Sequence, residues 1–179
     1  YGCCCLGSIA RTRFGRDPFD AEASFDHAAF AARAGVATRM LDNVLDQTYW
    51  PLAEQQAEAM AKRRIGVGFL GLGSALVMLG VAYNTEAARE FAAKVARAMR
   101  DEAYLASIDL AKERGAFPAL DVERYLASGF ARRLPKEVRH AIREHGIRNS
   151  HLLSIAPTGT ISLAFADNAS NGIEPAFSW

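Results

Sequence analysis

The fold prediction rests on residues 63–72, Arg63-Arg64-Ile65-Gly66-Val67-Gly68-Phe69-Leu70-Gly71-Leu72. The apolar run over 65–70 is typical of a short buried strand. A polar helix is expected before it, over about 52–63, and an apolar helix after it, over 74–81. A strand set between helices favours an α/β architecture.

Helical patterns continue outward on both sides of this run. Apolar residues near a 3.6-residue period predict a helix from Phe25 to the break at Tyr49-Trp50-Pro51. Asn84 or Thr85 is expected to cap a long amphipathic helix that stops at Gly115. A shorter helix is expected from about 136 to His145, ending at Gly146. Residues 1–16 and 151–156 look strand-like. In the first of these helices the residues near that period are Phe25, Ala29, Ala32, Val36, Met40, Val44 and Leu45.

Two other interpretations of the central stretch follow from the same residues. The run from Ile65 to Thr85 has no charged residue and is flanked by Lys62-Arg63-Arg64, so a membrane-associated protein with a span at 65–81 is one alternative. Gly66-Val67-Gly68-Phe69-Leu70-Gly71 matches G-x-G-x-x-G, so a dinucleotide-binding module is another. That motif requires a strand before the first glycine, and a polar helix is expected there instead.

Composition narrows the range of functions. The chain has 179 residues, 50% of them hydrophobic and 23% charged, which is ordinary globular usage and excludes a disordered tail. Lys plus Arg number 21 and Asp plus Glu number 20, so the net charge of +1 disfavours general nucleic-acid binding. The first residue is Tyr1 rather than Met, and we expect the chain to be a piece of a larger protein.

Cys3, Cys4 and Cys5 are the only cysteines and stand in one run. A secreted disulfide framework needs cysteines spread along the chain, so a reducing, cytoplasmic setting is expected. Metal sites usually space cysteines as C-x-x-C, and none of the four histidines adds a ligand pattern, so no metal site is predicted. The run itself is either redox-active or incidental. Asp42 and Asp46 are expected to form a solvated acidic face.

A second candidate site comprises Pro157, Thr158, Gly159, Thr160, Ile161 and Ser162. A strand is expected before this segment and a helix from about Ile161. Backbone amides at a helix start, together with hydroxyls and a glycine that permits close approach, can bind an anion. The segment has no lysine and is therefore not a P-loop. An ordinary helix cap decorated with Ser and Thr remains the alternative.

Five stretches in chain order carry a resemblance to one family. They are Tyr1–Ile9 (compare C-N-L-G-S-I), Leu41–Asp46 with Pro51 (LDNVID…P), Arg63–Leu72 (RRIGLGVMGL), Arg148-Asn149 with Ala156–Ser162 (RN…APTGTIS), and Gly172–Pro175 (GIEP). Together they resemble the catalytic subunit of ribonucleotide reductases. The APTGTIS form is similar to the adenosylcobalamin-dependent, class II branch.

The resemblance implies a ten-stranded α/β barrel, of which residues 1–179 would be a single helix-rich fragment. It also implies an oxidoreductase that converts ribonucleotides to 2′-deoxyribonucleotides for DNA synthesis by thiyl-radical chemistry. Cys4 falls at the position of one of two reducing cysteines, with Cys5 where the family has Asn or Asp. Residues 157–162 fall on the loop that binds the substrate phosphates. The family's radical motif, Asn-x-Cys-x-Glu, and the other reducing cysteine are absent from these 179 residues, so the fragment alone is expected to be inactive.

The partners implied are a ribonucleotide, a thioredoxin-like or other dithiol reductant, the rest of the parent chain and a second parent subunit in a homodimer. Adenosylcobalamin is expected on the parent rather than on this fragment. No nucleic acid or membrane partner is expected, and the localisation implied is cytoplasmic. The sequence leaves open whether the substrate is a diphosphate or a triphosphate.

Overall fold

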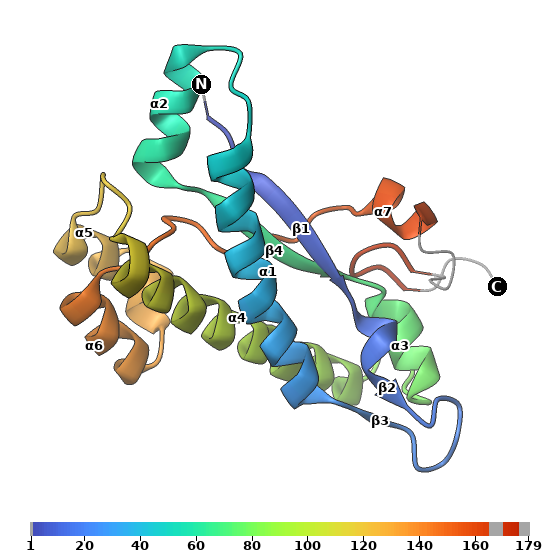
Figure 1. Ribbon diagram of the computed structural model, residues 1–179. Helices are drawn as coiled ribbons and strands as arrows, with labels where there is room; N and C mark the ends of the chain where they lie inside the picture. The colour runs from blue at the N-terminus through green and yellow to red at the C-terminus, as the bar shows by residue number, and fades with distance from the viewer. Residues whose placement is uncertain (1, 165–169, 176–179) are drawn as a thin grey trace.

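A parallel sheet organises the molecule, whose computed structural model describes residues 2–164 and 170–175 (Figure 1). Strands β1 (Cys5–Ala10) and β4 (Ile65–Leu70) pair in parallel, with Cys5 opposite Ile65. Residues 151–154 run along the other edge of β4: the amide of Val67 donates to the carbonyl of Leu152, and the amide of Ser154 donates to the carbonyl of Val67. The order β1, β4, 151–154 places β4 in the centre and confirms the predicted α/β class.

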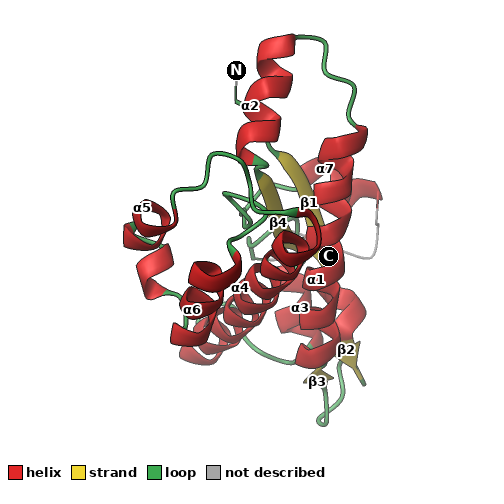
Figure 2. Cartoon of the chain, turned by 60° about the vertical axis from the view of Figure 1, so that its left-hand side comes forward, coloured by secondary structure: helices red, strands yellow, loops and turns green. Residues whose placement is uncertain are grey.

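Helices form most of the remaining chain (Figure 2). Their bounds are α1 His27–Gln47, α2 Ala53–Lys62, α3 Leu72–Met78, α4 Glu86–Arg114, α5 Val122–Ala127, α6 Lys136–His145 and α7 Gly159–Ala164. Short 3₁₀ turns cover Arg11–Phe14 and Ala131–Arg133, and β2 (Gly15–Arg16) pairs with β3 (Ser24–Phe25) in a small antiparallel hairpin.

Local capping chemistry sets the helix ends. The side chain of Thr85 accepts a hydrogen bond from the amide of Ala88, and α4 stops at Gly115, which has φ +84°. Gly146 ends α6 in the same way, at φ +75°. These stops were predicted and are confirmed. Helix α5 was not predicted, because it is a six-residue helix with too few turns to show a period; Asp121 caps it.

The main core lies on one face of the sheet. Ile65, Val67 and Phe69 of β4 point to this face and pack with residues of α1 and α4. Successive strand residues point to opposite faces, so Gly66 and Gly68 lie on the other face. Leu6 of β1 shares that second face and is 55% exposed. Helices therefore cover one side of the sheet, and the second side retains exposed apolar surface.

Most of the apolar residues whose spacing predicted α1 do not lie on its buried face. Val36, Met40 and Val44 are exposed by 58%, 54% and 41%, whereas the face that packs between the sheet and α4 consists of Phe30, Ala34, Thr38, Leu41, Asp42 and Leu45. The 3.6-residue period correctly predicted a helix, but the residues that it picked out lie mostly on the exposed side of that helix. Apolar residues occupy both sides of this alanine-rich helix, and only the packing partners select one of them.

Both alternative interpretations of the central stretch are also wrong. Residues 65–70 form a strand and residues 72–78 a seven-residue helix, so no continuous helix covers 65–81. No helix among residues 2–164 and 170–175 is long and apolar enough to cross a membrane. Gly66 and Gly68 lie inside β4 rather than in a turn that follows a strand, which removes the geometry that the dinucleotide motif needs.

A buried polar network ties the N-terminal ends of the strands together. Asp42 is fully buried and accepts hydrogen bonds from Arg63 Nε and Asn149 Nδ2, each at 2.9 Å. Oδ1 of Asn149 also accepts a hydrogen bond from the hydroxyl of Ser107 in α4, at 2.9 Å. Burial lowers the pKa of Arg63, but its hydrogen bonds to Asp46 and Asp42 outweigh burial and raise that pKa overall. The expectation of a solvated Asp42 is therefore wrong, because Arg63 and Asn149 meet it inside the fold.

Candidate functional site

The two predicted site regions lie at opposite ends of the parallel sheet. Cys4 directly precedes β1, whereas residues 157–162 follow the segment 151–154. With a rise of about 3.3 Å per residue, the pairing registers separate them by roughly 20 Å along the strands. The described residues thus form two regions, and the fold does not bring Cys4 into contact with the loop.

Strand alternation distinguishes the three cysteines, all of which are free thiols. Cys5 is partly buried against the main core, on the helix-covered face. Cys4 is exposed and, as its neighbour in an extended chain, points toward the opposite face. Partial burial raises the pKa of the Cys4 thiol, Cys3 raises it further, and the positive charge of Arg64 opposes both. Burial also raises the pKa of Cys5.

The loop over 157–162 contains a strained residue. Thr158 has φ +53°, which is uncommon for a residue with a Cβ, and it is 6% exposed. Its Oγ1 is buried and has no hydrogen-bond partner in the described part of the chain. Gly159 keeps an ordinary φ, and a Cβ built there meets no atom within 4 Å. The backbone therefore turns at Thr158, and open space lies beside Gly159.

Residues 170–174 support this loop from the side. Ser162 Oγ lies 2.8 Å from both the carbonyl oxygen of Gly159 and Oδ1 of Asn171. The amide of Gly71 donates to the carbonyl of Asn171 at 2.7 Å, which ties the same turn to the start of α3. A Cβ at Gly172 would lie 2.9 Å from the carbonyl oxygen of Ala156, so the turn packs closely against the loop.

This arrangement can bind an anion. The first amides of a helix have no intrahelical acceptor, and in α7 they adjoin the space beside Gly159. An unpaired buried hydroxyl is also costly to leave without a partner, and Thr158 supplies one. The sequence analysis predicted this loop as a candidate anion site. It did not predict the left-handed backbone at Thr158 or the hydrogen bond from Ser162 to Asn171. No local sequence signal marks either.

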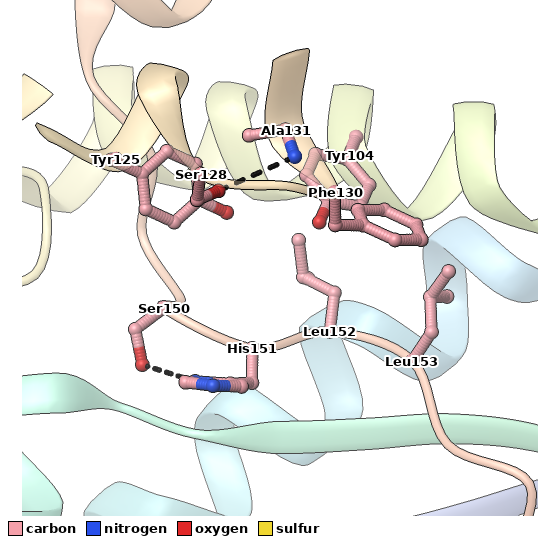
Figure 3. Close-up of a pocket in the computed structure, with 9 residues that line it drawn as sticks. All are labelled: Tyr104, Tyr125, Ser128, Phe130, Ala131, Ser150, His151, Leu152 and Leu153. Carbon is pink, nitrogen blue, oxygen red and sulfur yellow. Dashed lines mark hydrogen bonds between the residues drawn. The ribbon is translucent and has the colours of Figure 1, made fainter. Parts of the chain in front are cut away.

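A cavity of about 420 Å³ lies elsewhere, on the helix-covered side of the sheet (Figure 3). The rings of Tyr104 and Phe130 stack in its wall with centroids 6.0 Å apart, and Ser150 hydrogen-bonds His151 at 3.0 Å. Burial raises the pKa of Tyr125, which also lines it. No predicted site residue is among the lining residues, which include Ser128, Ala131, Leu152 and Leu153.

Comparisons with known proteins agree on one family. A family model described as the barrel domain of ribonucleotide reductase matches residues 1–179. The chain is 39% identical over 177 residues to a vitamin B12-dependent ribonucleoside-diphosphate reductase of Mycobacterium tuberculosis, covering 99% of this chain and 22% of that protein. It is 33% identical to the protein of the same description from Thermoplasma acidophilum, covering 99% and 20%. A ribonucleoside-diphosphate reductase subunit alpha of Chlamydia muridarum is 32% identical, covering 97% and 18%. The chain thus spans about a fifth of the length of these relatives.

Proposed function

This chain belongs to the ribonucleotide reductase barrel domain family, and we propose that it is one segment of the catalytic barrel of a longer enzyme that reduces ribonucleotides to 2′-deoxyribonucleotides. The observation that carries the proposal is the match of the whole chain, at 39% identity, to a B12-dependent ribonucleoside-diphosphate reductase. The parent enzyme would act in the cytoplasm as a homodimer, and a dithiol would regenerate it.

Cys4 is the proposed reducing thiol of this segment. In the net reaction, two thiols and a ribonucleotide give a disulfide, a 2′-deoxyribonucleotide and water. Cys4 would supply one sulfur, and the other would come from a part of the parent outside these 179 residues. Support comes from strand alternation, which points Cys4 away from the helix-covered core where Cys5 packs.

The loop over 157–162 is proposed to hold the substrate phosphates. The free amides at the start of α7, the open space beside Gly159 and the unpaired hydroxyl of Thr158 support this role. A substrate bound there would extend along the uncovered face of the sheet, the face to which Cys4 points.

The names of the relatives support vitamin B12 as the radical source of the parent. The described residues do not fit this cofactor, however. Cavities of about 420 and 350 Å³ suit a drug-sized ligand, and adenosylcobalamin is several times larger. We therefore propose that this segment alone does not hold the corrinoid, which would bind to the longer parent.

A cysteine series in the full-length parent tests the Cys4 assignment. Cys4→Ser should abolish repeated turnover with a dithiol reductant, because the redox couple needs two sulfurs. Cys3→Ser and Cys5→Ser are the matched controls and should keep it. Full turnover by Cys4→Ser, with loss in either neighbour, would move the reducing role to that neighbour.

Three loop variants test the phosphate assignment in the same parent. Gly159→Val fills the open space beside the helix start without a clash, and Thr160→Pro removes an amide donor; each should weaken nucleotide binding by more than about tenfold. Thr158→Ala removes one neutral hydrogen bond, about 0.5–1.5 kcal/mol, and should have a small effect. Normal nucleotide binding by folded Gly159→Val and Thr160→Pro, measured by titration calorimetry, would leave the segment as a helix cap.

A further inference from the structure

Arg64 directly precedes β4, as Cys4 directly precedes β1. The strand register begins with Cys5 opposite Ile65, and one step earlier it places Cys4 next to Arg64. In adjacent parallel strands, paired residues point to the same face. Ile65 is fully buried in the core with Cys5 packed against it, so Cys4 and Arg64 both lie on the opposite face of the sheet.

An acidic residue of α2 holds Arg64 in place. Arg64 Nη2 lies 2.9 Å from Oε1 of Glu58, and Lys62 Nζ lies 2.7 Å from the same oxygen. The Arg64 side chain is only 23% exposed, so both the ion pair and the adjoining strand constrain its position just before β4. The αL conformation of Arg63, whose side chain is locked to Asp42, sets the direction in which the chain enters β4.

We infer that Arg64 is a positioning residue that favours Cys4 over Cys5 as the reactive thiol by stabilising the Cys4 thiolate. This inference rests on the proposed function of Cys4. A neighbouring cation favours the thiolate, which is the form that reacts and that leaves in thiol–disulfide exchange.

The electrostatic surroundings of the cysteines support the same choice. The groups that act on Cys4 are Cys3 and Arg64, the residue that directly precedes β4. Burial and Cys3 raise the pKa of Cys4 overall, and Arg64 opposes both effects. Cys5 feels burial, Cys3 and Cys4, all of which raise its pKa, and no cation offsets them. Glu58 and Lys62 on α2 and His151 beside β4 surround Arg64 itself.

The step that benefits is re-reduction of the enzyme. A thiolate of the dithiol reductant attacks the partner sulfur of the disulfide, and the bond to Cys4 breaks with its electron pair leaving on Cys4. The second thiolate of the reductant then attacks the mixed disulfide and releases the partner cysteine as a thiolate. The reductant ends as a disulfide, and its two protons end on the two enzyme thiols. A leaving thiol with a lower pKa departs faster, so Arg64 next to Cys4 favours the first step.

Alkylation of single thiols tests this inference in the full-length parent. Iodoacetamide labelling is followed from pH 6 to 10 in a background that carries Cys3→Ser and Cys5→Ser, with circular dichroism as the folding check. Arg64→Gln should move the midpoint of the Cys4 profile up by about half a pH unit or more, whereas Arg64→Lys should keep most of the wild-type value. The midpoint is the readout because a thiolate of higher pKa is also more nucleophilic, which partly hides the change in rate at one pH.

Arg89→Gln is the matched control, since Arg89 lies on the surface of α4 and pairs with Glu86, its one ion-pair partner among the described residues. An unchanged Cys4 midpoint in Arg64→Gln, or an equal shift in Arg89→Gln, would overturn the inference. If Arg64→Gln does not fold, the same labelling is carried out at about 1 M salt on the protein that keeps Arg64. Screening of the Arg64 charge should raise the midpoint of the Cys4 profile, and no rise would overturn the inference. The proposed role of Cys4 is tested separately: full turnover by Cys4→Ser would overturn that role, whatever midpoints the labelling experiment gives.

Discussion

Asp42 is a buried carboxylate on which several polar contacts of the fold converge. It is fully buried and joins α1 to Arg63 before β4 and to Asn149 before the segment 151–154. Arg148 Nε and Arg114 Nη1 add contacts at 3.4 and 3.7 Å. One carboxylate thus fixes where two parallel strands begin.

Removing that carboxylate should be severe. Asp42→Ala leaves Arg63 buried with only Asp46 as a charge partner, and we expect a loss of about 3–5 kcal/mol in the free energy of unfolding of the full-length parent. Urea denaturation measures it. Glu86→Ala, which removes an exposed pair with Arg89, is the control and should change stability by less than about 1 kcal/mol. Equal effects of the two variants would show that the network contributes no more than a surface pair.

Arg11 presents the opposite case, a buried charge without a partner. It is fully buried, its guanidinium carbon lies 3.2 Å from the centre of the Phe69 ring, and Nε and both Nη atoms have no acceptor among the described residues. Burial lowers the pKa of Arg11 to about 9, so it stays protonated at neutral pH.

Arg11→Met should therefore stabilise the protein. We expect a gain of about 1–3 kcal/mol, because the relief of charge burial exceeds the lost contact with the Phe69 ring. The urea midpoint of the full-length parent is the measurement, with Arg13→Met as the neighbouring comparison. A lower urea midpoint for Arg11→Met than for the unmodified protein would contradict this prediction.

At the scale of elements, β4 depends on glycines because its second face is closely approached. A Cβ at Gly68 would lie 2.7 Å from the carbonyl oxygen of Ser154, and one at Gly66 would lie 2.5 Å from Cδ2 of Leu6. The first neighbour is backbone and has little freedom to shift. The glycines that suggested a nucleotide motif thus serve strand packing.

Gly68→Ala should separate the segment 151–154 from β4. We expect a loss of about 1–3 kcal/mol from the overpacking, measured by urea denaturation. Gly129→Ala is the matched control, since its Cβ would meet nothing within 4 Å and its φ is not positive, so its effect should be near zero. If Gly68→Ala is as stable as Gly129→Ala, the close approach of Ser154 to Gly68 does not limit the side chain at position 68, and the prediction is wrong.

At the scale of the whole molecule, the exposed apolar surface needs a covering. Val36, Met40 and Val44 form a stripe along α1, and Leu6 and Ile155 expose 55% and 69% of their surface. Such surface on a chain that spans about a fifth of its relatives' length is what a barrel segment presents when considered alone.

The 179-residue chain in isolation should therefore self-associate. Sedimentation velocity should show oligomers whose share grows with concentration, and Met40→Lys should reduce them, because it places a charge in the middle of the α1 stripe. Glu90→Lys, at an exposed position of α4, is the control substitution. A monodisperse monomer with a cooperative melt would contradict this expectation.

The sequence alone determined the elements whose signals are local. The strand over 65–70, the cap at Thr85 and the stops at Gly115 and Gly146 depend on neighbours within a few residues, and they lie where they were predicted. The family was likewise readable, because its motifs are short and occur in order along the chain.

Tertiary structure alone decided which side of α1 is buried, that Asp42 lies in the interior, and that Cys4 stands beside Arg64 on the face of the sheet opposite the main core. Each depends on residues more than 20 positions apart in the chain, brought together by parallel pairing of strands and by the helices packed across them. No local pattern carries that information, because the same alternation and the same helical period fit several partners until the register is set.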